Sequence, residues 1–452
     1  MSNNIVLKRG LNIPVKGEAA LKTTRTVKAG TIAIKPTDFK GFSPRLLVRE
    51  GDRVLAGSPV MADKQCPDIL ITSPVSGTVA EIVRGEKRKL LEIRITADEK
   101  NEYLDFGAKN VAGMSAQQVK ELLLQSGLWT ALIQRPYGVI ANPEVKPKAI
   151  FVSAFTTAPL AADVDYALGN EAEFVQTGVN ALAKLTGGGI HFSLSAKNYS
   201  STPFHKIENV ITHTFEGKHP AGNVGVQISH IAPIQKGETV WTVSLLLLSA
   251  IGKLFATGKL DLRRKVAVTG PVAKDPAYVE ALPGMNMKDI AEFYDNSAND
   301  VRFVSGDALT GKNVGANGSL GFFDNQVTLL HEGTEREVLG WAKPFRFNQF
   351  SSTRSYFSWL SPKKKYAMDT NLHGGPRAFL MSDCYGQVLP MDIFPVYLIK
   401  ACIAGDIDNM EKFGIYEVLP EDLALCEFVD PSKNDIQEII SRGIDLMIKE
   451  MA

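Results

Sequence analysis

Two short, glycine-punctuated runs between residues 43 and 95 constrain the fold of this chain more than any other feature. The first reads VREGDRVLAG over residues 48–57, and the second reads PVSGTV over residues 74–79. Apolar and polar residues alternate between glycines that can adopt positive φ, as short strands joined by tight turns require. The segment therefore predicts a small β-barrel or β-sandwich module.

The pattern VxEGDxVxxG followed by PxSGTV resembles the biotinyl/lipoyl hammerhead, in which two similar half-motifs fold around a pseudo-twofold axis. In carrier proteins of that family the hairpin between the halves presents a modified lysine, and Lys64 is the candidate here. Its neighbours Asp63 and Gln65 do not match the Met-Lys-Met hairpin of the carriers, so a solvated lysine is the simpler interpretation. A stand-alone carrier protein is the alternative, and a mass increment on Lys64 would identify it.

The length and composition of the chain narrow the class of protein. A chain of 452 residues exceeds one ordinary hydrophobic core, so two to four domains are expected. The net charge of +1 lacks the basic excess of a nucleic-acid binder. The N-terminus lacks the features of a secretory signal, which favours the cytoplasm. The longest apolar run, residues 240–251, is shorter than the roughly 20 residues of a transmembrane helix, so a buried helix and membrane contact through a partner are expected.

The pattern of apolar residues changes three times after the hammerhead and its N-terminal extension, which we place at residues 1–105. Residues 106–260 alternate strand-like runs such as 148–154 with helical stretches at 116–128, 171–185 and 243–255, which predicts a Rossmann-like α/β layer. Residues 261–345 read as strands around a helical stretch at 287–294, the plan of a β-grasp (SLBB-like) domain. The sequence therefore predicts a multidomain α/β protein.

The last predicted domain, residues 346–452, is helical. Residues 391–404 and 434–451 are apolar at helical spacing, and Asp422, Ser432 and Asp435 are candidate caps. A C-terminal helical bundle follows from this pattern.

Two glycine-rich segments suggest ligand binding. Residues 306–313, GDALTGKN, differ by one residue from a phosphate-binding P-loop, but they run into a turn-rich stretch instead of a helix, which disfavours nucleotide binding. Gly187, Gly188 and Gly189 precede His191, and no GxGxxG motif opens a helix nearby. Their backbone could approach a planar ligand closely, although a loop that ends a helix is the commoner use of glycine.

The metal-ligating residues do not form a recognisable site. Five histidines fall within forty residues, but no HExxH motif or i, i+4 pair is present, so hydrogen-bonded histidines are the simpler interpretation. The four cysteines contain no CxxC pair, which predicts neither a zinc site nor an iron–sulfur cluster. These residues are His191, His205, His213, His219, His230, Cys66, Cys384, Cys402 and Cys426.

One segment mixes aromatic and basic side chains. Residues 354–366 read RSYFSWLSPKKKY. This composition is typical of a protein docking surface or of a surface near anionic lipid head groups. A solvated loop is the simpler interpretation, because short charge runs usually are solvated.

The order of the modules resembles the flavin-carrying subunit of respiratory complex I and the iron–sulfur subunit of the Rnf complex. A closer resemblance lies in three segments, KRGLNIPVKG at 8–17, HPAGN at 219–223 and GETVW at 237–241. These resemble the A-subunit family of the bacterial Na⁺-translocating NADH:quinone oxidoreductases (Na⁺-NQR). The cluster-bearing relatives end in a CxxxCP pattern, whereas here Cys426 is followed by Asp430 and Pro431, which implies a lost cluster or a helix-capping Asp-Pro.

The resemblance implies a peripheral subunit on the cytoplasmic face of the bacterial inner membrane. Its complex oxidises NADH, reduces ubiquinone or menaquinone and exports sodium ions, and the subunit is not catalytic alone. NADH, flavins and an iron–sulfur centre would be handled by other subunits, chiefly the flavin-carrying membrane subunit. This chain would help to form the quinone-reduction end, with Gly187, Gly188, Gly189 and His191 as candidate quinone contacts. An Rnf-type electron-transfer subunit is the alternative, and bound iron would identify it.

Overall fold

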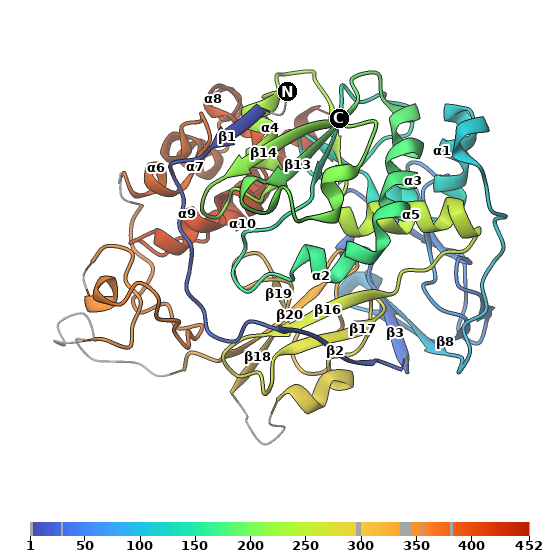
Figure 1. Ribbon diagram of the computed structural model, residues 1–452, viewed down its shortest axis with the longest axis horizontal. Helices are drawn as coiled ribbons and strands as arrows, with labels where there is room; N and C mark the ends of the chain where they lie inside the picture. The colour runs from blue at the N-terminus through green and yellow to red at the C-terminus, as the bar shows by residue number, and fades with distance from the viewer. Residues whose placement is uncertain are drawn as a thin grey trace.

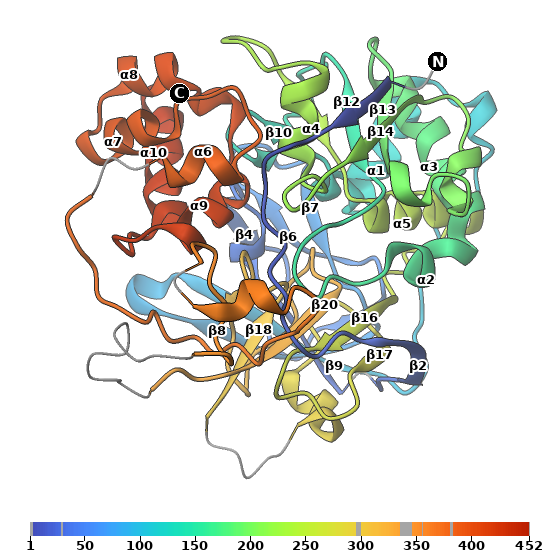
Figure 2. The same cartoon turned by 60° about the vertical axis from the view of Figure 1, so that its left-hand side comes forward.

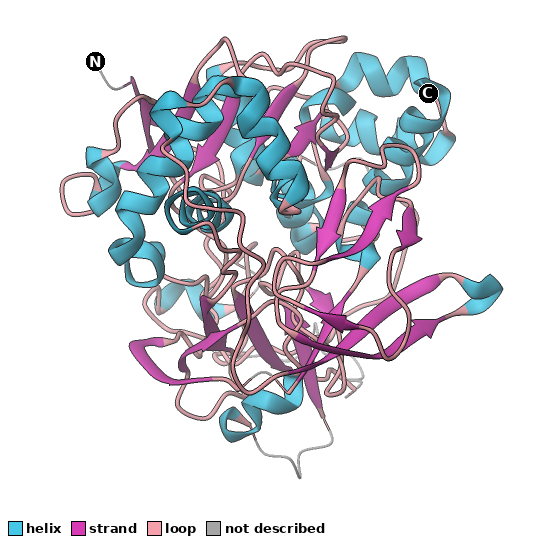
Figure 3. Cartoon of the chain, turned by 90° about the vertical axis from the view of Figure 1, so that its right-hand side faces the viewer, coloured by secondary structure: helices cyan, strands magenta, loops and turns pink. Residues whose placement is uncertain are grey.

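The computed structural model describes residues 3–28, 30–294, 300–334, 346–354, 356–379 and 383–451, and within them the strands form four β-sheets. Figure 1 shows the C-terminal helices on one side of the molecule and the N-terminal barrel strands on the other. Figure 3 shows most helices in the upper half and the sheets of the barrel and of the third domain below. None of the helices in the described ranges is long and apolar enough to span a bilayer.

The predicted β module is present as two small facing sheets. One has the order β3 (Thr31–Ile34), β9 (Leu90–Ala97), β8 (Gly77–Arg84) and β5 (Arg53–Val54), and the other has β4 (Pro44–Leu46), β6 (Pro59–Asp63) and β7 (Leu70–Thr72). Alternate residues such as Ile93 and Ile95 of β9 are fully buried between them, as period-two strands require. A Cβ on Gly77 would lie 2.1 Å from the carbonyl oxygen of Thr96, so this glycine of the second half-motif permits a close strand contact.

A seven-stranded mixed sheet organises the α/β domain. Its order is β1 (Asn3–Val6), β14 (Ile211–Glu216), β13 (Ile190–Ser195), β12 (Ile150–Ser153), β15 (Val240–Thr242), β10 (Ile133–Arg135) and β11 (Val139–Ile140). The first five strands are mutually parallel, and β10 runs antiparallel to its two neighbours. On one face pack α1 (Ala116–Gln125), α3 (Ala172–Leu182) and α5 (Leu245–Thr257), and α4 (Val224–Ile231) covers part of the other.

The third domain is built on a six-stranded sheet. Its order is β19 (Lys312–Asn313), β18 (Val301–Ser305), β20 (Gln326–His331), β16 (Arg264–Thr269), β17 (Ala277–Ala281) and β2 (Ala20–Thr26). The helical stretch expected at 287–294 is a 3₁₀ segment, η9 (Met287–Phe293), because Ile290 has non-helical dihedral angles. Of the P-loop-like residues 306–313, 306–311 form the turn of the antiparallel β18–β19 hairpin and 312–313 are strand β19, so they do not lead into a helix.

Five helices of the C-terminal region share a separate hydrophobic core that contains Leu398, Ile440 and Ile444. Of the expected caps, Asp422 lies inside η13 (Pro420–Leu423), the Ser432 hydroxyl donates to the carbonyl of Ala378, and Asp435 directly precedes the last helix. Asp422 does act as a cap, because its Oδ2 accepts from the amide of Leu419, the N-cap residue of η13, at 3.0 Å. The expectation for Ser432 was wrong, because its hydroxyl bonds to Ala378 instead of a helix end. The helices are α6 (Cys384–Val388), α7 (Pro395–Ala404), α8 (Ile407–Phe413), α9 (Ala424–Val429) and α10 (Ile436–Met451).

Short helical segments connect these elements. They are α2 (Val164–Leu168), η1 (Pro36–Asp38), η2 (Glu86–Arg88), η3 (Val111–Gly113), η4 (Leu128–Ala131), η5 (Gly169–Glu171), η6 (Ala183–Leu185), η7 (Ala196–Asn198), η8 (Pro203–Lys206), η11 (Phe357–Leu360) and η12 (Ile415–Glu417).

The N-terminal extension does not stay with the barrel. In Figures 1 and 2 its dark blue trace runs from β1 in the seven-stranded sheet to β2 in the six-stranded sheet. β1 pairs in parallel with β14, and β2 pairs with β17. These edge pairings tie two sheets together before the barrel begins, while the domain boundaries given above stay predictions.

Candidate functional site

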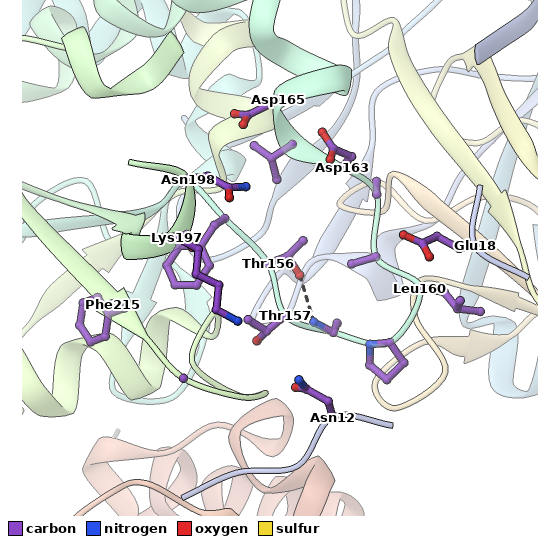
Figure 4. Close-up of a pocket in the computed structure, with 18 of the residues that line it drawn as sticks. Asn12, Glu18, Thr156, Thr157, Leu160, Asp163, Asp165, Lys197, Asn198 and Phe215 are labelled. Atoms are coloured by element: carbon purple, nitrogen blue, oxygen red, sulfur yellow. Dashed lines mark hydrogen bonds between the residues drawn. The ribbon is translucent and has the colours of Figure 1, made fainter. Parts of the chain in front are cut away.

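A cleft lies where the parallel strands β12, β13 and β14 end. Because parallel strands end at a common edge, the segments that follow them, 154–165, 195–198 and 216–217, line one cavity of about 450 Å³ (Figure 4). Residues 12–15 and Glu18 of the N-terminal extension, together with Thr202 and Lys365, contribute further lining. The cleft therefore depends on segments that are far apart in sequence.

Hydroxyl and carboxylate groups in the lining are held by the surrounding backbone. The Thr157 hydroxyl accepts from the amide of Gly222 at 3.0 Å and contacts His219 Nδ1 at 3.2 Å. Asp163 caps α2 by accepting from the amide of Tyr166 at 2.7 Å, and Asp165 accepts from the Thr202 hydroxyl at 2.6 Å. These groups are therefore pre-organised before a ligand enters.

The charges that line the cleft favour a neutral ligand over an anionic one. Four carboxylates line the cleft and only two lysines do, and one of the lysines, Lys365, pairs with Glu18. A nucleotide or flavin phosphate would meet this negative potential, which opposes its entry. Apolar side chains such as Phe155 and Leu160 lie beside the hydroxyls, so a neutral, partly apolar ligand fits the lining better.

The glycine loop predicted to contact a ligand lies at the opposite edge of the sheet. Gly187, Gly188 and Gly189 precede β13, and neither they nor His191 line the cleft. A Cβ on Gly188 would lie 1.9 Å from the carbonyl oxygen of Lys148, and Gly189 has φ of +81°. Local packing and backbone conformation therefore account for two of the three glycines, and a ligand role for this loop stays a prediction.

Replacement of these glycines tests whether local packing constrains the loop. We expect Gly188→Ala to lower the free energy of unfolding by about 1 kcal/mol, because the loop must shift to free the Lys148 carbonyl. Gly187→Ala is the matched control, since its Cβ would meet nothing closer than Lys146 Nζ at 3.5 Å. Urea unfolding measures both, and equal stabilities of the two variants would contradict the packing account.

His191, which is half-buried, pairs with the buried His213 in the sheet. Its Nδ1 lies 2.9 Å from His213 Nε2, and its ring stacks on Phe151 with centroids 4.6 Å apart. Burial, assisted by the neighbouring His213, lowers the pKa of His191 from 6.5 to about 4, and burial also lowers the pKa of His213. The pair is thus neutral at physiological pH, and a structural role accounts for both rings.

The depressed histidine pKa values predict acid sensitivity. As the pH falls from 6.5 toward 4, the unfolded chain binds protons that the folded pair does not, so the free energy of unfolding should decrease. We expect the double variant His191→Asn/His213→Asn to show a shallower decrease over this window. Stability measured by urea unfolding at several pH values checks this, and an equally steep decrease in the double variant would contradict the assignment to this pair.

The other histidines are also dispersed. His230 Nε2 bonds to the carbonyl of Pro390 at 2.7 Å, and His205 bonds to the carbonyl of Thr202. Within the described ranges, no three side chains of His, Cys, Asp or Glu come together as metal ligands.

The cysteines and Lys64 occupy ordinary structural positions. Cys426 is fully buried in α9, and burial raises the pKa of its thiol, while the pKa of Cys402 is raised to about 12. Asp430 accepts from the amides of Ser432 and Asn434, so its side chain holds the turn between α9 and α10. Lys64 is exposed on the β6–β7 turn.

The strand expected at 148–154 also indicates where the cleft lies. Once 148–154 is taken as a parallel strand, the residues that follow it are expected at the ligand-binding edge of the sheet. Thr156, Thr157, Asp163 and Asp165 all lie there. The glycine run at 187–189 instead suggested a site at the amino end of β13.

The fold and the cleft define a multidomain α/β protein that carries a barrel-sandwich module and a preformed ligand cleft. Three family models match this chain. They are the NqrA N-terminal barrel-sandwich hybrid domain at residues 5–98, the NqrA second alpha/beta domain at 114–260 and the NQRA C-terminal domain, an SLBB model, at 265–316.

Full-length relatives agree with these models. The A subunit of the Na(+)-translocating NADH-quinone reductase of Rhodopirellula baltica is 34% identical over 98% of both chains. That of Cellvibrio japonicus is 36% identical over 97% of this chain and 98% of its own. This chain therefore belongs to the NqrA family, the A subunits of the Na⁺-translocating NADH:quinone reductases. Among solved structures, an NAD⁺-reducing [NiFe]-hydrogenase is similar at a TM-score of 0.34 and 10% identity over 75% of this chain and 62% of that chain, too weak a likeness to support an inference.

Proposed function

We propose that this chain works as the A subunit of a Na⁺-translocating NADH:quinone reductase, peripheral on the cytoplasmic face of the bacterial inner membrane. The observation that carries the proposal is identity of 34 to 36% along nearly the whole length of relatives bearing that name. The other subunits of the complex, especially the flavin-carrying membrane subunit, would be its partners. Its relation to the complex I and Rnf subunits stays a prediction from module order.

We assign NADH oxidation, the flavins and the iron–sulfur centre to the other subunits. The net negative lining of the cleft opposes phosphate-bearing cofactors. Burial raises the pKa of the half-buried Cys402 thiol and of the fully buried Cys426 thiol, which opposes the thiolate form that a cluster requires. This subunit would therefore carry no redox centre itself.

The quinone-reduction end is where this subunit would contribute. A quinone is neutral and planar, and its carbonyls could accept hydrogen bonds from the hydroxyls of Thr156 and Thr157 while Phe155 and Leu160 contact its ring. This cleft is our first candidate for the quinone site. Gly187, Gly188, Gly189 and His191 are the second.

The test is purification of the tagged chain from gently solubilised membranes of its host. We expect hydrophobic flavoprotein subunits to co-purify and the preparation to show Na⁺-stimulated NADH:quinone reduction. Recovery of the chain alone from the soluble fraction, without that activity, would overturn the proposal. A mass increment on Lys64 would then favour the carrier alternative, and bound iron the Rnf-type alternative.

A further inference from the structure

The segment 346–366 combines a basic charge with outward-facing aromatic side chains. It contains Arg346, Arg354, Lys363, Lys364 and Lys365, and it contains no Asp or Glu. At its centre, η11 exposes Trp359 and Leu360, at 51% and 56% of their surfaces. Ser355 lies outside the described residues.

This exposure is imposed by how the segment is held. The buried hydroxyl of Ser358 accepts from the amide of Ser351 at 3.1 Å, which turns the residues on either side of it outward. Lys364 Nζ donates to the carbonyl of Phe347 at 2.8 Å and to Asn348 Oδ1 at 2.9 Å. These bonds close the segment into a loop.

The end of the segment is anchored to the N-terminal extension. Tyr366 is buried, its amide donates to the carbonyl of Pro14 at 2.7 Å, and its carbonyl accepts from the amide of Lys16 at 2.9 Å. Lys365 pairs with Glu18. Arg346 donates to Gln349 Oε1 and lies over the ring of Tyr356. Arg354 and Lys363 are exposed, and they lie near the exposed Trp359 and Leu360 in sequence. Figure 1 shows this part of the chain, in orange, at the left-hand side of the molecule, and in Figure 2 its helical turn faces the viewer.

We propose that Arg354 and residues 356–363 form a lipid-contact surface that binds anionic phospholipid head groups, with Trp359 and Leu360 entering the interface. The proposal rests on the proposed function only in requiring a membrane nearby. Basic side chains are attracted to an anionic leaflet, and tryptophan favours the depth of the head groups. Protein–protein interfaces, in contrast, are depleted of lysine, so the exposed Lys363 close in sequence to the exposed Trp359 favours a lipid over a protein partner.

The test is sedimentation of the full-length chain with vesicles. One set contains phosphatidylcholine alone, and the other contains one third phosphatidylglycerol. We expect binding to the anionic vesicles, weaker binding to the neutral ones, and a decrease in binding as salt screens the attraction. No binding of the wild-type chain to anionic vesicles, or equal binding to both sets, would overturn the proposal.

Variants locate the surface. Trp359→Ala/Leu360→Ala should weaken binding about tenfold or more, because two apolar side chains no longer enter the interface. Lys363→Glu should weaken it about fivefold or more, since one basic residue near an anionic surface contributes about a factor of five. The matched controls are Phe394→Ala, 60% exposed at the N-cap of α7, and Lys109→Glu, exposed before η3. Equal losses in the controls would overturn the assignment to this segment.

Quenching of tryptophan fluorescence gives a second readout that does not depend on the affinity for vesicles. Lipids brominated in their acyl chains should quench part of the tryptophan emission of the wild-type chain, and Trp359→Phe should abolish that quenching while it retains binding. Undiminished quenching in Trp359→Phe would contradict the proposal. Co-purification with the other subunits is measured separately, so failure here leaves the proposed function intact. If the Trp359/Leu360 variant lost co-purification but kept vesicle binding, the surface would belong to a protein contact and the lipid proposal would fall.

Discussion

Asp422→Ala is expected to lower the free energy of unfolding by about 3 to 5 kcal/mol, because it leaves a buried guanidinium without its main counter-ion. Arg135 at the end of β10 and Asp422 in η13 are 1% exposed each, and Arg135 Nη1 donates to Asp422 Oδ2 at 2.9 Å. Glu421 also accepts from Arg135, at 2.7 Å, but its side chain is half exposed and screened by water. The pair joins the seven-stranded sheet to the C-terminal helices.

Urea unfolding of the full chain measures this loss, and two further variants interpret it. Glu438→Ala breaks the exposed i, i+4 pair with Arg442 and should cost less than about 0.5 kcal/mol. Arg135→Met/Asp422→Leu removes both charges and should recover much of the stability lost in Asp422→Ala. If Asp422→Ala were no worse than Glu438→Ala, the buried pair would not stabilise this junction.

Gly252→Ala is expected to destabilise the chain by about 3 kcal/mol, although helix propensity alone predicts a gain of about 1 kcal/mol for the same change. Gly252 lies in α5, and a Cβ there would stand 1.8 Å from the carbonyl oxygen of Phe174 in α3. In return, a Cβ on Gly178 of α3 would stand 2.4 Å from the carbonyl of Leu248. The two helices therefore approach backbone to backbone, and neither backbone can yield locally.

Thermal or urea unfolding of Gly252→Ala checks this, with Gly113→Ala as the matched control. Gly113 has no atom within 4 Å of its ideal Cβ position and does not have positive φ, so its replacement should be close to neutral. If Gly252→Ala were more stable than the wild-type chain, helices α3 and α5 could move apart without a loss of stability, and the packing account would be wrong.

Several elements were predictable because their signal is local. The half-motifs EGD and SGT mark the turns and short strands of the barrel, and the helical spacing of residues 434–451 predicts α10. The helix expected at 391–404 begins only at Pro395, since proline suits the first turn of a helix and not its interior. The stretch at 287–294 shows the limit of spacing alone, because the non-helical dihedral angles at Ile290 make it 3₁₀ instead of α.

The candidate site was predictable only in part. The run Gly187–Gly189 stood out in sequence, yet in the fold it lies at the amino edge of β13, where close approach to Lys148 explains Gly188. The Thr156–Thr157 pair carries no motif, and its place in the cleft depends on the order of three parallel strands. Single-sequence patterns do not specify that order.

The sequence by itself determined the succession of modules and the family of the chain, because both depend on residues that are close together along it. Only the tertiary structure decided that β1 and β2 leave the barrel to complete two other sheets. It also decided that Arg135 meets Asp422, and that the cleft is assembled from segments as distant in sequence as Asn12 and Lys365. Edge pairing and buried charge pairing depend on which surfaces meet in space, and short-range patterns of apolar residues and turns do not record this.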